Sequence, residues 1–170
     1  MNPQKKFIRS KDHGFSLVEV MIAMFVLTLL ALATTRTMTY TKFTTEDTLY
    51  EATTLNLGLS IIEQMKGRSY HELMNPPLVG GKPSFTMRLG AGAQEILILD
   101  EANQLDVPIV TEAGGDQTKR LPVTVTPSMT PMTEGIGLWL EVHYSFPHPR
   151  SGKIRERFVY NAKTNVESLD

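Results

Sequence analysis

Cysteine is absent from the 170 residues of this chain. This absence excludes disulfide bonds, a Cys-x-x-Cys redox site and metal sites built on thiolates. The chain also lacks an excess of either charge, because 17 Lys and Arg residues stand against 18 Asp and Glu residues, for a formal net charge of −1. Nucleic-acid-binding domains normally show a basic excess, so we expect no nucleic-acid partner. The length allows one ordinary domain with an appendage.

Glycine and proline are missing from residues 15–57, which makes one long helix the expectation there. Within it, residues 15–33 (FSLVEVMIAMFVLTLLALA) are apolar except for Ser16, Glu19 and Thr28. A run of about 20 apolar residues spans a bilayer as a helix. A basic segment precedes the run, so the positive-inside rule places the N-terminus in the cytoplasm and sends the remainder outward. The basic residues are Lys5, Lys6, Arg9 and Lys11.

An ordinary secretory signal peptide is the alternative interpretation of this segment, with Ala31-Leu32-Ala33 as its cleavage site. Two features weigh against it. The apolar run is longer than the core of a usual signal peptide, and it contains Glu19 between Val18 and Val20. A carboxylate in hydrocarbon costs roughly 2.5–3.5 kcal/mol, so its default interpretation is functional, with a partner.

Residues 11–20 (KDHGFSLVEV) resemble the prepilin signature of type IV pilins and of the pseudopilins of type II secretion. The resemblance combines a short basic leader, a glycine followed by an aromatic residue, a small polar residue, an acid at a fixed offset and a long apolar run. It is strong over roughly residues 8–40, and beyond them it is architectural only.

The resemblance implies how this N-terminus is processed and used. Prepilin peptidase would cut between Gly14 and Phe15, remove the leader 1–14 and methylate the new N-terminal amine of Phe15. Glu19 would be the family's acidic position, which pairs with the Phe15 amine of a neighbouring subunit and sets the register between helices. The implied partners are the peptidase, other pilin or pseudopilin subunits, the assembly platform of the inner membrane and membrane lipid.

Two departures from major pilins favour a low-abundance subunit: the first half of the helix has no proline, and the C-terminal region has no cysteine pair. We therefore expect a minor subunit of a type IV pilus, held in the inner membrane before assembly. A minor pseudopilin of type II secretion and a membrane-tethered binding protein remain the alternatives. No cofactor, metal site or enzymatic activity is expected.

The helical pattern continues through residues 34–67, where a threonine-rich stretch leads into an amphipathic half. Gly67 is a natural residue to follow the helix end, with Lys66 in its last turn. The threonines predict a mechanically soft part, because their hydroxyls compete for backbone groups. Two apolar faces follow, for the chain's own sheet and for neighbouring subunits, or both for one domain. The faces are Ala52, Leu55, Leu59 and Ile62, and Tyr50, Leu57, Ile61 and Met65.

Residues 68–170 change in character, with glycine and proline clusters between short runs that alternate between apolar and polar residues. The runs are 84–89, 95–99, 121–126, 137–146 and 153–160. The last two predict a hairpin with a turn at 147–152. The expected fold is therefore α+β: a long N-terminal helix whose second half carries a small antiparallel sheet, as in pilins.

Candidates for chemistry are weak. His71-Glu72 lacks the second histidine of a zinc helix, and His143 and His148 are expected to be a strand and a turn residue. Asp100, Glu101 and Asp106 do not have the spacing of a calcium loop. A basic cluster near the hairpin is expected to be a solvated strand face, with an acidic partner or DNA as its functional alternatives. It consists of Arg150, Lys153, Arg155 and Arg157.

Overall fold

A computed structural model of the chain describes residues 16–89, 93–110, 118–133 and 137–164. The chain divides into two compact units, Met1–Lys42 and Phe43–Asp170. One helix, α1 (Leu17–Lys66), contributes residues to both units. The leader 1–14 and Phe15 lie outside the described residues.

The C-terminal unit, Phe43–Asp170, confirms the α+β expectation, with two antiparallel sheets in place of the one predicted. The first sheet has the order β1-β2-β3, and the second has the order β4-β5-β6-β7. A short helix, α2 (Tyr70–Met74), precedes them. The strands are β1 (Leu78–Val79), β2 (Lys82–Leu89), β3 (Ala93–Ile98), β4 (Asn103–Val110), β5 (Thr118–Pro131), β6 (Gly137–Pro147) and β7 (Ile154–Thr164).

The predicted C-terminal hairpin is confirmed as β6 and β7. Its register runs from Gly137 opposite Thr164 to Pro147 opposite Ile154. Period-2 burial explains it, because Leu140, Val142 and the other apolar residues of one face are buried while the opposite face is open. Gly152 closes the turn with a φ of +66°, a conformation that a residue without a Cβ adopts easily.

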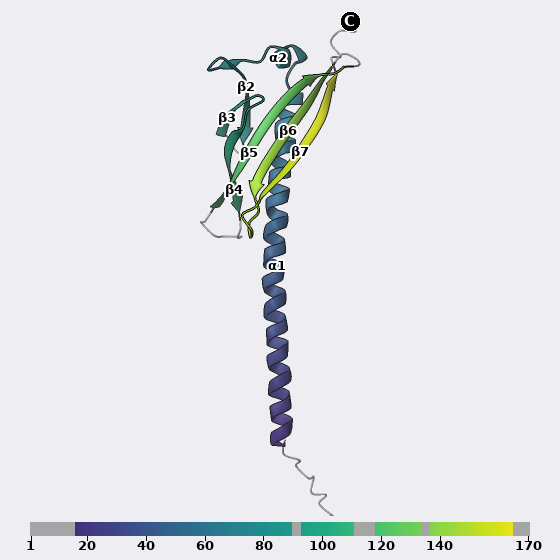
Figure 1. Cartoon of the computed structure of the whole chain (residues 1–170), viewed down its shortest axis with the longest axis vertical. Coiled ribbons are helices and arrows are strands. Elements are labelled where there is room, and N and C mark those ends of the chain that lie inside the picture. Colours follow the sequence, from purple (N-terminus) through teal and green to yellow (C-terminus); the bar gives the residue numbers. More distant parts are fainter. Residues whose placement is uncertain (1–15, 90–92, 111–117, 134–136, 165–170) are drawn as a thin grey trace, which may run out of the picture. The chain divides into compact units, whose positions relative to one another are not determined.

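The core of the C-terminal unit lies between the sheets and the second half of α1 (Figure 1). Gly58 marks the closest approach of helix and sheet, because a Cβ added there would lie 3.1 Å from Tyr144 Cε1 and 3.1 Å from Val159 Cγ2. Burial in this core raises the pKa of Tyr144. The helix supplies Tyr50, Thr54, Leu57, Gly58, Ile61, Ile62 and Met65 as its buried residues.

The C-terminal end of α1 is stabilised by contacts with β7 that the local sequence does not predict. Gly67 follows Lys66 as expected, but it does not adopt the left-handed φ of a glycine cap. Lys163 of β7 instead donates from Nζ to the carbonyl of Lys66, at 2.7 Å, and to that of Arg68. A cation at a helix C-terminus satisfies open carbonyls and interacts favourably with the helix dipole.

Candidate assembly interface

Ser16 and Glu19 define the start of α1. The Oγ atom of Ser16 accepts a hydrogen bond from the Glu19 amide at 3.2 Å, and its carbonyl accepts one from the Val20 amide at 3.2 Å. Ser16 is therefore the N-cap, a role that the prediction missed although Ser-x-x-Glu spacing is a signal for it. Glu19 lies exposed in the first turn, where the helix dipole favours negative charge. Gly14 and Phe15, the predicted processing residues, lie outside the described residues.

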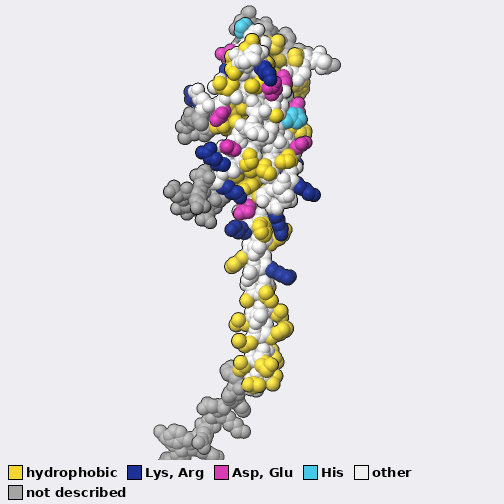
Figure 2. All heavy atoms as spheres, turned by 60° about the vertical axis from the view of Figure 1, so that its left-hand side comes forward, with side chains coloured by type: hydrophobic (Ala, Val, Ile, Leu, Met, Phe, Trp, Pro, Cys, Tyr) yellow, Lys and Arg dark blue, Asp and Glu magenta, His cyan; other side chains and the backbone are white. Residues whose placement is uncertain are grey.

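The rest of this helical segment presents an apolar surface. By length and composition, a stretch of α1 is suited to cross a membrane, and none of that stretch is buried in the structure. Figure 2 shows hydrophobic side chains around the helix toward its N-terminal end. Large exposed apolar surfaces of this kind mark contact with lipid or with other protein chains. Members between 50 and 80% exposed include Leu17, Met21, Ile22, Met24, Phe25 and Leu27.

The threonine-rich stretch continues the helix without a break. Thr35, Thr37 and Thr39 each donate a side-chain hydrogen bond to the carbonyl four residues earlier, at 2.8–2.9 Å. Each of these three hydroxyl donors is therefore satisfied inside the helix. Such bonding lets threonine lie in apolar surroundings, and it also bends helices slightly, so the predicted softness of this stretch stays a prediction.

The second half of α1 separates its two predicted faces. Tyr50, Leu57, Ile61 and Met65 are buried in the core with the chain's own strands, so this face serves the chain's own sheets. Leu55 and Leu59, by contrast, are each 42% exposed, and Ala52 is exposed with them. The alternative that both faces are buried in one domain is therefore wrong for these three residues.

Ile62 is the exception, because it was grouped with Ala52, Leu55 and Leu59 and is only 2% exposed. Strands of two sheets, and not of one, join the core at this end of the helix. The buried arc of the helix is therefore wider than a single sheet requires. The outer face consists of Ala52, Leu55 and Leu59.

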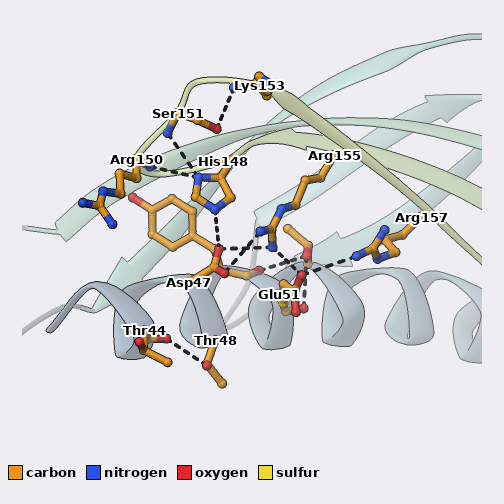
Figure 3. Close-up of polar contacts among 12 residues, drawn as sticks. Thr44, Asp47, Thr48, Glu51, His148, Arg150, Ser151, Lys153, Arg155 and Arg157 are labelled. Carbon is orange, nitrogen blue, oxygen red and sulfur yellow. Dashed lines mark hydrogen bonds and ion pairs between the residues drawn. The ribbon is translucent and has the colours of Figure 1, made fainter. Parts of the chain in front are cut away.

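A cluster of charged side chains fastens the β6–β7 hairpin to α1 (Figure 3). We call it the hairpin clamp, and it consists of Asp47 and Glu51 of α1 with His148, Arg155 and Arg157 of the hairpin. The Arg155 guanidinium lies between both acids, with Nη1 3.1 Å from Asp47 Oδ1, Nη2 3.3 Å from Asp47 Oδ2, and a further contact to Glu51. Arg157 makes one looser contact to the helix acids, 3.5 Å to Glu51 Oε1, and donates from Nη1 to the Glu156 carbonyl at 3.1 Å.

His148 ties the hairpin turn into the same clamp. Its Nδ1 accepts hydrogen bonds from the amides of Arg150 and Ser151, both at 3.2 Å, and its Nε2 lies 3.2 Å from Asp47 Oδ1. With Nδ1 bound to two amides of the turn, the imidazole presents Nε2 to Asp47. Nearby, the Arg150 guanidinium stacks on Phe43 at 4.5 Å from the ring centroid.

The basic cluster is exposed as expected at Arg150, Lys153 and Arg157, and only Arg155 is partly buried. Three of its four cations engage residues of α1: Arg150 contacts Phe43, and Arg155 and Arg157 contact the helix acids. The acidic partner of the cluster is therefore the chain's own helix. The arrangement therefore favours DNA less as a partner of this cluster, because Asp47 and Glu51 partly offset the positive charges of Arg155 and Arg157.

The clamp leads to a testable prediction. Arg155→Met is expected to lower the free energy of unfolding by about 2 kcal/mol, because two partly buried carboxylates then lose the guanidinium that lies between them. Arg157→Met, a control of the same chemistry, should cost no more than about 0.5 kcal/mol, since Arg157 is 55% exposed. Denaturant unfolding of the full chain in detergent, followed by circular dichroism, measures both. Equal effects of the two substitutions would contradict the clamp.

The remaining candidate ligands lie apart. Glu101 pairs with Lys82, Asp106 faces outward from β4, and the Asp100 amide donates to the Pro127 carbonyl at 2.8 Å. His143 pairs with Glu141 on the outer face of β6, away from the His148 turn. Within the described residues, no group of three or more His, Cys, Asp or Glu side chains is placed to hold a metal ion.

Comparison with known proteins gives one match. Residues 9–35 match the family model described as the prokaryotic N-terminal methylation motif. The matched range includes Gly14, Phe15 and Glu19. Neither curated proteins nor solved structures give a match to the chain.

Proposed function

We propose, from the premise that residues 9–35 carry the type IV pilin signature, that this chain is a filament subunit made as a precursor. In this proposal, prepilin peptidase cleaves it after Gly14 and methylates Phe15. The helix then holds the protein in the inner membrane, with its N-terminus in the cytoplasm and its C-terminal unit outside. Assembly with other pilin-like subunits follows, and the role is structural and not catalytic.

The single observation that carries the proposal is the position of Glu19. It is a carboxylate in the first turn of a helix whose neighbouring side chains are apolar and exposed. A simple membrane anchor gains nothing from such a charge, which is costly in hydrocarbon. A subunit that must meet another in a fixed register gains a specific ionic contact, since the processed amine of Phe15 supplies the opposite charge.

The outer face of α1 supports a second contact along the same helix. Leu55 and Leu59 are exposed on the side of α1 away from the buried residues. In a filament, neighbouring helices would cover these side chains. The finer proposal is a minor subunit of a type IV pilus, on the absence of a helix proline and of a cysteine pair. The alternatives are a minor pseudopilin and a tethered binding protein.

Processing supplies the direct test. Intact-mass analysis of filament-associated protein should show loss of residues 1–14 and the gain of one methyl group. Gly14→Phe should leave uncut precursor in the membrane, because the residue before the scissile bond no longer fits. Ala33→Leu is the matched control and should be processed normally. A mature chain that begins after Ala33, or a block by Ala33→Leu, would support the signal-peptide alternative and contradict the proposal.

A further inference from the structure

Aromatic side chains cover the solvent-facing side of the β6–β7 hairpin. Trp139, Phe158 and Tyr160 are 46%, 57% and 66% exposed. Their rings form a row, with 6.5 Å between the centroids of Trp139 and Tyr160 and 6.2 Å between those of Phe158 and Tyr160. Exposed contiguous aromatic surface of this kind is typical of binding sites.

The backbone of β7 next to this row is open on one side. β7 is the last strand of its sheet, and no strand of the described chain pairs with its other edge. The Glu156 carbonyl and the Ala162 amide bond to nearby side chains, Arg157 Nη1 and Asn161 Oδ1, and not to β6. Backbone groups of alternate residues point to the same side of a strand. The even-numbered residues of β7 therefore direct their N–H and C=O groups to the open edge.

Natural sheets usually protect such an edge with proline, a bulge or charged side chains. β7 has no proline, and its register with β6 runs without interruption over its whole length. Two of its charges, Arg155 and Arg157, turn toward α1 in the hairpin clamp. The edge is protected only in part, by the exposed Glu156 and by side-chain hydrogen bonds at the Glu156 carbonyl and the Ala162 amide, so it can still take one more strand.

The two faces beside this edge differ in character. The even-numbered face carries Ile154, Phe158 and Tyr160, all more than 55% exposed. The odd-numbered face packs against α1, and on it Arg157 remains 55% exposed, with one 3.5 Å contact to Glu51 that leaves most of its guanidinium open to a further acid. An added strand would place alternate side chains beside each face. The added strand would fit both faces best if aromatic or β-branched residues, which lie beside the even-numbered face, alternated with acidic residues, which lie beside Arg157.

We propose that the open edge of β7 binds an extended segment of a partner protein as an added β-strand, with acidic residues beside Arg157 and apolar residues beside Phe158 and Tyr160. A second copy of this chain fits less well, because two β7 strands would bring their Arg157 side chains to the same face. Nucleic acid also fits less well, because Glu141 and Glu156 lie on the aromatic face and repel phosphate. This surface is separate from the helix that the proposed assembly uses.

A synthetic peptide tests the proposal with the full chain in detergent micelles. The probe has about nine residues, alternating Glu with Val or Tyr. Trp139, the chain's only tryptophan, reports binding through its fluorescence. We expect a saturable change in fluorescence. Two further versions of the peptide carry N-methyl groups on alternate residues, one version on each set of amides. The version methylated on the amides that face β7 should bind about tenfold more weakly, because its pairing hydrogen bonds are lost. A peptide with Lys in place of Glu should also bind about tenfold more weakly.

Variants of Ala162 separate edge pairing from contact with the aromatic row. Ala162→Pro removes one edge N–H, which bonds to Asn161 Oδ1 in the free chain and would turn to the added strand on binding, and should weaken peptide binding by about tenfold. Ala162→Thr keeps that N–H and should bind normally. The absence of a saturable change, or equal binding of the two N-methylated peptides and the parent, would overturn the proposal. Concentration-dependent dimerisation that Ala162→Pro abolishes would overturn it in favour of a second copy. If Ala162→Pro fails to fold, the N-methylated peptides decide.

Discussion

Ile61→Ala is expected to lower the free energy of unfolding of the C-terminal unit by about 3 kcal/mol. The Ile61 side chain is fully buried where α1 meets the sheets, so its truncation leaves a cavity that the surrounding strands cannot close completely. The loss combines the transfer free energy of the removed methyl and methylene groups with the dispersion contacts of the cavity lining. Denaturant unfolding of the full chain in detergent, followed by circular dichroism, measures it.

Leu59→Ala is the matched control, two residues away on the outer face of the same helix. Its side chain is 42% exposed, so we expect a loss of at most about 1 kcal/mol in the isolated chain. In the filament, the same change should reduce incorporation, because neighbouring subunits would cover Leu59. If Leu59→Ala destabilised the isolated chain as much as Ile61→Ala, the assignment of two separate faces would be wrong.

The long helix and the C-terminal hairpin were predictable because each has a strong local pattern. Residues 15–57 contain no glycine or proline, and the β6 run alternates between apolar and polar residues from Leu140 to Phe146. β4 was missed although Leu105, Val107 and Ile109 alternate in it, because the acids Asp100, Glu101 and Asp106 were considered as loop ligands. Pro108 is tolerated there because β4 is an edge strand of its sheet.

The candidate assembly residues divide in the same way. The sequence singles out Glu19 because an acid in an apolar run is costly and demands a partner, and its role in assembly stays a prediction. Ser16 and α2 carried local signals that were overlooked. Ser69 and Glu72 form a capping box at α2, and Ser16 and Glu19 have the same Ser-x-x-Glu spacing. The hairpin clamp was not predictable, because it joins Asp47 and Arg155, which are 108 positions apart in the chain. Only the tertiary arrangement brings these charges together.

Glu19→Gln is expected to remove the subunit from the filament without affecting its earlier steps. Membrane insertion should persist, or improve slightly, because a charge leaves the apolar segment. Cleavage after Gly14 should also persist, because the scissile bond is unchanged. Incorporation should fall at least about tenfold, because the Phe15 amine of a neighbour would then be buried without its counter-ion. Glu46→Gln, which removes a helix charge outside the apolar run, should incorporate normally.

Quantitative mass spectrometry of sheared filaments, with this protein counted against the major subunit, tests the central role of Glu19 most directly. We expect the Glu19→Gln protein to be processed, to accumulate in the inner membrane and to be scarce in filaments. The Glu46→Gln protein should reach the wild-type ratio to the major subunit. Processed Glu19→Gln protein in filaments at the wild-type ratio would contradict this role of Glu19, and would favour a tethered binding protein whose helix is only an anchor.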